Sequence, residues 1–369
     1  MATENDTPEA QIDWTHLPDM RRTVANPMQQ SFLLYHRFPA MYSQVGLARD
    51  FPVRDTSGLD VLVVVLRTLY AQLAQPHRGA SGSSESGDFA EEIARDEERN
   101  PLLRLAWSDL ADTPESHRAQ SAARHAIVQA LARQAGSRLP DLSFLALAES
   151  EAMQRTIWRR LPFLLYRREL LWCPADAPDA DWNTHLVDPS PAWARCGLVT
   201  WDCARSLPET IAELFGSFTA PALNRQELYL FNRPAAIRVH CTVPATQGGQ
   251  HAGARPAFRD IQRVRLTPEG LDPPESHEYV LIAVVRLRGD DGDRDDLVRT
   301  YAASGAVVLP TRGFYYGRID WLFGAPGESY MLYYTLSTFR PATRAPVPEL
   351  PRMPEGWEDA LESMRRAAN

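Results

Sequence analysis

The chain has 369 residues and a formal net charge of −8, with 44% hydrophobic and 23% charged residues. This composition is typical of a folded, soluble protein and argues against a nucleic-acid binder, because phosphate binding needs an excess of cations. No hydrophobic run is long enough to span a bilayer, and the acidic, polar start is not a secretory signal. Four scattered cysteines are too few for a disulfide framework, so we expect a cytoplasmic or nuclear protein.

The first half of the chain is predicted to be helical. Residues 1–20 are expected to form a flexible leader. Apolar residues recur on one face of a helix from Asn26 until Pro39, which interrupts it. A longer helix is predicted over 58–73, where apolar side chains repeat with the spacing of a buried stripe. The glycine- and serine-rich segment 77–88 is expected to be a mobile insertion.

Short strands dominate the second half. Before them, a helix is predicted over 113–136, and the segment 153–171 is expected to begin as a helix and become strand-like. A short helix is predicted over 206–215, because Ser206 and Glu209 can form a capping box. The predicted strands cover 227–231, 236–243, 279–287, 305–309 and 329–335. Helices followed by strands, rather than alternating with them, predict an α+β fold.

The sequence predicts one domain over residues 21–340. Its helical half spans 21–170, and its β-rich half spans 171–340. A proline-rich tail, 341–369, follows the domain and is expected to end in a short helix over 357–368.

The residues do not establish a catalytic or metal site by their spacing. Structural zinc sites use closely paired cysteines, and Cys173, Cys196 and Cys203 form no such pair. The acidic run 290–296 resembles a calcium loop but lacks the glutamate that closes one. The sequence has neither a phosphate-binding loop nor a G-x-S-x-G elbow. We therefore expect buried free thiols, a solvated acidic turn, and no metal or other cofactor.

Five short blocks, taken in order, resemble the ubiquitin-specific protease family of deubiquitinases. Residues 26–28 (Asn-Pro-Met), followed by 31–34, are similar to the family's N-x-C block. The strongest match is 279–285 (Tyr-Val-Leu-Ile-Ala-Val-Val), which is similar to the family strand Y-x-L-x-A-V-V. The other blocks lie at 206–215, at 233–240, and at 320–321 together with 329–334. The resemblance implies a papain-like cysteine-protease fold with a helical thumb, a finger region and a β-rich palm.

The resemblance breaks down at the residues that would carry the chemistry. Met28 stands where the family has its nucleophilic cysteine, and Leu297 stands where the family's G-H-Y block supplies the general base. A thioether cannot be deprotonated to a nucleophile, and a leucine cannot accept a proton. Asn26 matches the asparagine that stabilises the oxyanion in the family. The resemblance therefore implies a relative without catalytic activity.

The leading hypothesis is an inactive scaffold that binds ubiquitin, a ubiquitin-like protein or another partner protein. Aromatic residues favour the centres of protein interfaces, although packing in the palm core is the simpler role for any one of them. The candidate contacts are Tyr301, Phe314, Tyr315, Tyr316 and Trp321. Two alternatives stay open: an active cysteine deubiquitinase that uses a displaced thiol such as Cys203, and a lysine-free effector that evades ubiquitination.

All 39 residues counted as Lys or Arg are arginine. Codon bias in a GC-rich genome explains such a composition without any function. A chemical reading is that the chain has no side-chain amine, the group that ubiquitination modifies. Beside the resemblance to ubiquitin proteases, this suggests a protein that works near ubiquitin-transfer machinery.

Overall fold

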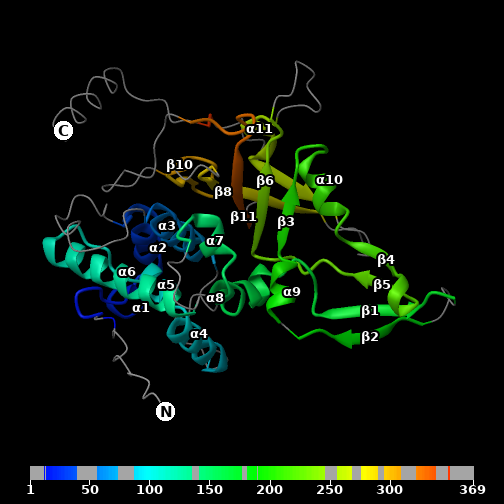
Figure 1. Cartoon of the computed structure of the whole chain (residues 1–369), viewed down its shortest axis with the longest axis horizontal. Coiled ribbons are helices and arrows are strands. Elements are labelled where there is room, and N and C mark those ends of the chain that lie inside the picture. Colours follow the sequence, from blue (N-terminus) through cyan, green and yellow to red (C-terminus); the bar gives the residue numbers. More distant parts are fainter. Residues whose placement is uncertain are drawn as a thin grey trace, which may run out of the picture.

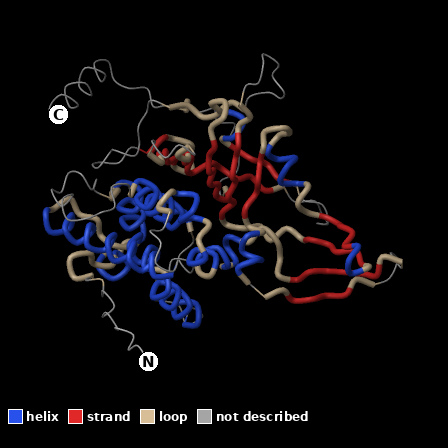
Figure 2. Tube along the Cα trace, viewed as in Figure 1, coloured by secondary structure: helices blue, strands red, loops and turns tan. Residues whose placement is uncertain are grey.

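The computed structural model describes residues 12, 14–39, 56–73, 87–134, 141–176, 181–188, 190–245, 256–267, 276–289, 295–308, 321–337 and 348–349. This part of the chain forms a helical half, a four-stranded sheet that projects outward, and a seven-stranded sheet (Figure 1). Figure 2 shows that helices and strands are largely segregated, so the predicted α+β class is confirmed. Among the described helices, none is long and apolar enough to cross a membrane.

The helical half is built from short and medium-length helices. They are α1 (Met20–Thr23), α2 (Pro27–His36), α3 (Ser57–Gln72), α4 (Gly87–Arg99), α5 (Pro101–Ala106), α6 (Pro114–Gln134), α7 (Phe144–Ala148) and α8 (Glu151–Gln154). The helices predicted from Asn26, over 58–73 and over 113–136 correspond to α2, α3 and α6. Leu17 and Met20 are fully buried, so residues 17–20 belong to the packed domain rather than to the predicted leader. The predicted insertion lies almost wholly outside the described residues.

Helix α3 is the centre of this half. All of its residues except the last are buried, because its sequence is apolar on nearly every side. Its first turn lies directly against the start of α7. A Cβ atom on Gly58 would come within 2.2 Å of the Leu142 carbonyl oxygen and 2.3 Å of the Phe144 nitrogen, so the contact requires glycine. Helices α2, α5 and α7 all pack on α3.

The four-stranded sheet, called the arm below, extends away from the helices (Figure 1). Its strands are β1 (Glu169–Pro174), β2 (Asn183–Leu186), β4 (Gly216–Ala220) and β5 (Arg225–Tyr229), in the antiparallel order β2-β1-β5-β4. Helix α9 (Pro191–Arg195) lies at its base. All of β2 and the middle of β4 are exposed. The sequence predicts β1 in part and β5, but neither β2 nor β4.

The seven-stranded sheet, called the palm sheet below, has the order β10-β9-β8-β11-β6-β3, with β7 paired to β8. Its strands are β3 (Leu198–Trp201), β6 (Ala236–Thr242), β7 (Arg263–Leu266), β8 (His277–Arg286), β9 (Leu297–Tyr301), β10 (Val307–Val308) and β11 (Ser329–Leu336). The central pairings are antiparallel, whereas β3 runs parallel to β6 at one edge. The predicted strands at 236–243, 279–287, 305–309 and 329–335 are confirmed as β6, β8, β10 and β11.

The palm sheet separates two hydrophobic cores. Val285 and Met331 lie on the face that packs against the helical half, in the first core. Val284 and Leu332 lie on the opposite face, in the second core. Two short helices, α10 (Leu207–Ala212) and α11 (Phe258–Ile261), contribute to that second core. The predicted capping box of Ser206 and Glu209 is present at the start of α10.

Candidate functional site

The start of α2 holds Asn26 and Met28, the residues that the sequence resemblance aligns with a catalytic block. The Asn26 side-chain oxygen accepts hydrogen bonds from the backbone N–H groups of Met28, at 2.9 Å, and Gln29, at 3.4 Å. Asn26 therefore serves as the N-cap of α2. The side chains of Met28 and Phe32, one turn apart, are 81% and 53% exposed. The helix start thus presents an apolar surface and no nucleophile.

Leu297 lies in β9 and faces away from α2. Its side chain is buried in the second core, while its neighbour Val298 lies in the first core together with Leu33 and Leu34 of α2. This follows from the alternation of side chains along a strand. Helix α2 and strand β9 both pack on α3. The structure therefore does not bring the Leu297 side chain to Asn26 and Met28.

Asp296, which precedes Leu297, joins three elements. Its carboxylate accepts hydrogen bonds from the backbone N–H of Phe144 at 2.9 Å and from the backbone N–H and Nε of Arg288 at 2.9 and 2.8 Å. Its own N–H donates to the Ser57 hydroxyl at the start of α3. The carboxylate is completely buried. It holds β9 against α3 and α7, which is a structural role.

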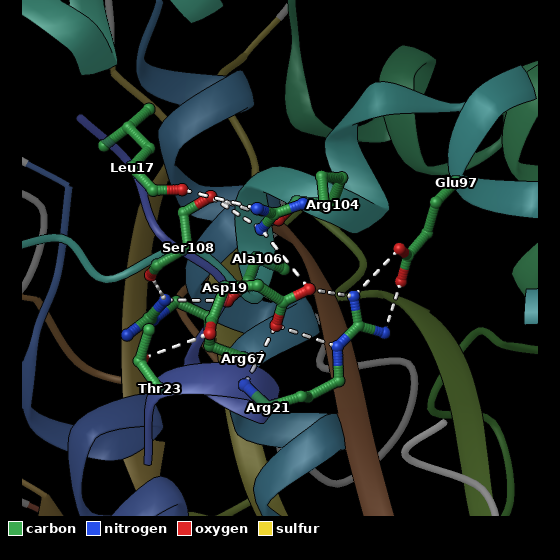
Figure 3. A network of polar contacts seen from close by, with 9 residues as sticks. All are labelled: Leu17, Asp19, Arg21, Thr23, Arg67, Glu97, Arg104, Ala106 and Ser108. Carbon is green, nitrogen blue, oxygen red and sulfur yellow. Dashed lines mark hydrogen bonds and ion pairs between the residues drawn. The ribbon is translucent and has the colours of Figure 1, made fainter. Parts of the chain in front are cut away.

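A polar network joins the start of the chain's first helix, α1, to α4 and α5 (Figure 3). The Arg21 guanidinium lies between two carboxylates and binds Asp19 at 2.7 Å and Glu97 at 2.7 Å. Burial works to lower the pKa of Arg21, but the hydrogen bonds and charges of Asp19 and Glu97 raise it above its usual value. Arg104 lies 3.8 Å from Asp19 and adds a second cation. Because the side chains of Arg21, Asp19 and Glu97 are nearly buried, the network acts as a clamp between helices.

Arg67, also in Figure 3, is completely buried in α3. Its two terminal nitrogens donate to three carbonyl oxygens, those of Ala106 at 2.7 Å, Ser108 at 3.0 Å and Leu33 at 3.0 Å. Burial lowers the pKa of Arg67 to about 9, so it remains charged at neutral pH. Its planar fork, with donors fixed in two directions, connects α2, α3 and the end of α5.

A second buried arginine, Arg238, also contacts several groups at once. Arg238 is fully buried, lies 4.1 Å above the Trp158 ring, and donates to Glu149 at 2.9 Å and to the Ala194 carbonyl at 3.2 Å. Other arginines that are buried or nearly buried pair with buried carboxylates, for example in Arg124–Asp60, Arg160–Asp96 and Arg288–Asp296. A lysine ammonium supplies neither the fork nor the flat surface that stacks on an indole. The contacts of Arg67 and Arg238 therefore explain why these two positions hold arginine rather than lysine.

Two of the predicted contact residues are part of the second core. Tyr301 is 1% exposed, with its ring 5.3 Å from that of Phe258. Trp321 is 4% exposed and lies 4.1 Å from the Arg299 guanidinium, which also donates to the Trp321 carbonyl at 2.8 Å. These two side chains pack the protein rather than offering a contact surface. Phe314, Tyr315 and Tyr316 lie outside the described residues.

Aromatic side chains gather on one face of the arm sheet, a feature that the sequence analysis did not find. Phe218, Glu227 and Trp172 are directly opposite one another on adjacent strands, so they share one face of the sheet. Arg225 and Tyr229, two residues from Glu227 on the same strand, lie on that face as well. Phe218 is 39% exposed, and Trp172, Arg225 and Tyr229 are half-buried.

Contacts within this surface hold its side chains in place. The Arg225 guanidinium lies 5.5 Å from the Trp172 ring and donates to Glu227 at 2.8 Å. The Tyr229 hydroxyl donates to the other Glu227 oxygen at 2.8 Å. Burial and this hydrogen bond raise the pKa of Tyr229 to about 12, so the hydroxyl stays neutral at physiological pH. We call the surface formed by Trp172, Phe218, Arg225 and Tyr229 the aromatic face.

Further rings anchor the aromatic face to the body of the protein. Tyr166 lies 5.3 Å from the Tyr229 ring and 5.4 Å from Phe215, a residue of the second core. Trp193 of α9 stacks on Tyr229 at 6.4 Å. Rigid, partly exposed aromatic and arginine side chains are the composition of protein-interface hot spots. Sequence reasoning missed them because the pairing of β1, β4 and β5 decides which residues share a face.

The four cysteines are all free thiols. Cys173 is buried in β1, Cys196 is exposed after α9, and Cys203 lies after β3, with its Sγ 3.6 Å from that of Cys241. Among the described residues, no group of three His, Cys, Asp or Glu side chains is placed to hold a metal ion. Of the contacts between described thiols, that of Cys203 with Cys241 lies within hydrogen-bond distance for sulfur.

Comparison with known proteins gives structural matches alone. Neither a family model nor a curated protein sequence matches the chain. Solved structures that match include the SAGA Ubp8/Sgf11/Sus1/Sgf73 DUB module, at 10% identity and a TM-score of 0.28 over 92% of this chain and 71% of that one. The same module bound to ubiquitin aldehyde matches at 12% identity and a TM-score of 0.27, over 90% and 70% of the two chains. TM-scores of this size do not establish a common fold.

Proposed function

We propose that the chain is a catalytically inactive protein with the layout of a ubiquitin-specific protease, and that it binds ubiquitin, a ubiquitin-like protein or another partner protein. The aromatic face of the arm is the observation that carries this proposal. The arm corresponds in chain order to the finger region that the resemblance implies, and the palm sheet corresponds to the palm. The sequence blocks and their order support the family part of the proposal.

The inactive state is supported by the two positions that match the family's catalytic pair. Met28 is exposed but has no ionisable group, and Leu297 is buried in the second core. Asn26 uses its side-chain oxygen to cap α2. Acyl transfer by a cysteine protease needs a thiolate beside a base, and these side chains supply neither.

Binding is supported by how the aromatic face is built. The Trp172 ring lies against the Arg225 guanidinium, Phe218 against the Tyr229 ring, and the Tyr229 hydroxyl bonds to Glu227. Little conformational entropy is therefore lost when a partner covers these three side chains. Arg225, which is already paired with Glu227, adds a planar guanidinium to this surface, a group that is enriched at interface hot spots. A surface of this composition on a sheet that projects outward suits a protein ligand better than a small molecule.

A titration with labelled ubiquitin tests the binding part. We expect saturable binding that weakens at least tenfold in Phe218→Ala, because this ring is the most exposed of the face. Leu161→Ala is the matched control, since Leu161 is also an exposed apolar residue but lies outside the arm. Absence of saturable binding up to about millimolar ubiquitin would contradict ubiquitin as the ligand.

A ubiquitin probe with a C-terminal electrophile tests the inactive state separately. We expect no covalent adduct with the wild-type chain, because Cys173, Cys203 and Cys241 are buried and the exposed thiol, Cys196, follows α9 rather than standing at the start of α2. An adduct that disappears in Cys203→Ser would instead establish the alternative, a deubiquitinase with a displaced thiol. The matched control is Cys196→Ser, which removes the exposed thiol.

A further inference from the structure

Cys203 and Cys241 are brought together by the parallel edge of the palm sheet. Strand β3 pairs with β6 so that Trp201 lies opposite Cys241. Two residues further on, Cys203 adopts a left-handed backbone conformation, with φ of 64°, which is uncommon for a residue other than glycine. This turn directs the Cys203 side chain to β6, where its Sγ lies 3.6 Å from Cys241 Sγ.

We propose that Cys203 and Cys241 are an oxidisable thiol pair, which a peroxide converts to a reversible disulfide. An S–S bond is about 2.05 Å long, so the two sulfur atoms have to approach by roughly 1.5 Å, a movement within reach of side-chain rotation. Cys173 and Cys196 lie in the arm and after α9, apart from this pair. The inference does not depend on the proposed function.

The two thiols are suited to different steps. Cys203 is 8% exposed and Cys241 is fully buried, so a peroxide reaches Cys203 first. The hydrogen bond between the two thiols lowers the pKa of Cys203, whereas the same bond and burial raise the pKa of Cys241. Cys203 is therefore the attacking thiolate, and Cys241 is the thiol that resolves the product.

The reaction proceeds in two balanced steps. The Cys203 thiolate attacks one oxygen of hydrogen peroxide, the O–O bond breaks, and the products are Cys203 sulfenic acid and hydroxide. Hydroxide takes the Cys241 proton and becomes water. The Cys241 thiolate then attacks the Cys203 sulfur, the S–O bond breaks, and the departing hydroxide is protonated by solvent. Two thiols are oxidised, and one peroxide is reduced to two waters.

The disulfide would link the segment that follows the edge strand, β3, to the neighbouring strand, β6. It joins the connection between β3 and α10 to β6, across 38 residues of sequence. That loop contains α10, β4 and β5, and so includes two strands of the arm. A disulfide of this kind in a reducing compartment is transient and reports oxidant level.

The test is peptide mapping of the full-length chain after brief treatment with hydrogen peroxide under native conditions. We expect a linked peptide that contains Cys203 and Cys241, a mass loss of about 2 Da, and recovery of the starting mass with dithiothreitol. The wild-type map alone decides the matter, whether or not a variant folds. Peroxide-treated protein in which both thiols stay free, or in which Cys203 gains oxygen without linking to Cys241, would overturn the proposal.

Two variants separate the pair from the other thiols. Cys241→Ser is expected to abolish the linkage and to leave Cys203 as a sulfenic acid that a dimedone probe labels. Cys196→Ser, which removes the exposed thiol, is expected to leave the linkage unchanged. Linkage that persists in Cys241→Ser, or that is lost in Cys196→Ser, would assign the reactive pair to other cysteines and contradict the proposal.

Discussion

In the palm sheet, Tyr333 and Tyr334 are fully buried, Tyr333 in the first core and Tyr334 in the second. In the arm, by contrast, Phe218 and Tyr229 are partly exposed to solvent. The palm is covered by the helical half on one face and by α10 and α11 on the other. The arm has exposed residues along β2 and β4 instead. Burial on both faces makes the palm a source of stability. The arm has little buried surface of its own, so its rings are available for binding.

Buried and exposed arginines differ in the number of groups that they contact. Buried Arg67 and Arg238 each make contacts in several directions that an ammonium cannot reproduce. Arg118 and Arg155 are mostly exposed, and their described ion pairs are with Glu115 and Glu151, one helical turn earlier in the chain, where lysine would serve equally well. Structure therefore explains part of the lysine-free composition, and codon bias or avoidance of ubiquitination remains a hypothesis for the exposed part.

The largest effect on the body of the protein is expected for Gly58→Ala. The new Cβ would come within 2.3 Å of two backbone atoms of the segment that begins α7. Neither this segment nor the buried start of α3 can move away easily. We expect a loss of more than about 4 kcal/mol or a failure to fold. The measurement is urea denaturation followed by circular dichroism. A loss below about 1 kcal/mol would mean that α3 and α7 are not packed as described.

A smaller loss is expected for Arg67→Met. The substitution preserves the apolar stem but leaves three buried carbonyl groups without this donor, at a cost of about 3 kcal/mol. Arg118→Lys is the exposed control and should change stability by less than about 0.5 kcal/mol. Equal stabilities of the two variants would show that buried arginine is not structurally required.

High pH is expected to destabilise the body through its buried tyrosines. Burial raises the pKa of Tyr70 from 10.0 to about 12. Between pH 10 and pH 12, the Tyr70 hydroxyl loses its proton in the unfolded chain but keeps it in the folded chain. The free energy of unfolding therefore falls as the pH rises through this range. The contribution of Tyr70 is about 2 kcal/mol by pH 12. Denaturation at pH 9 to 11 should give a shallower decline for Tyr70→Phe than for the wild type, and identical slopes would contradict the burial of this hydroxyl.

The smallest effect on stability is expected in the arm. Phe218 is 39% exposed, so Phe218→Ala should cost about 1 kcal/mol. The same variant is expected to lose binding, which separates the two roles. A loss of several kcal/mol would mean that the arm is part of the stabilising core.

The long, strongly patterned elements could be predicted from the sequence. Helix α3 and strands β8 and β11 are continuous apolar segments whose burial follows from composition alone. Strands β2 and β4 are not predicted, because each contains a single large apolar side chain, Leu186 and Phe218, among polar and small residues.

The candidate site was less predictable, because it depends on pairing between distant segments. Trp172 and Phe218 share a face only through their pairing with Glu227. Cys203 and Cys241 meet only because β3 and β6 run parallel. An aromatic residue such as Trp321 suits a core or an interface equally in sequence, and the covering elements decide between them.

Hydrogen exchange of the chain with and without saturating ubiquitin tests the central claim most directly. The account predicts slower exchange in β1, β4 and β5, the strands that carry the aromatic face, and unchanged exchange at the start of α3, where Gly58 is packed. Protection confined to other segments, with these three strands unchanged at saturation, would contradict the assignment of the arm as the binding surface.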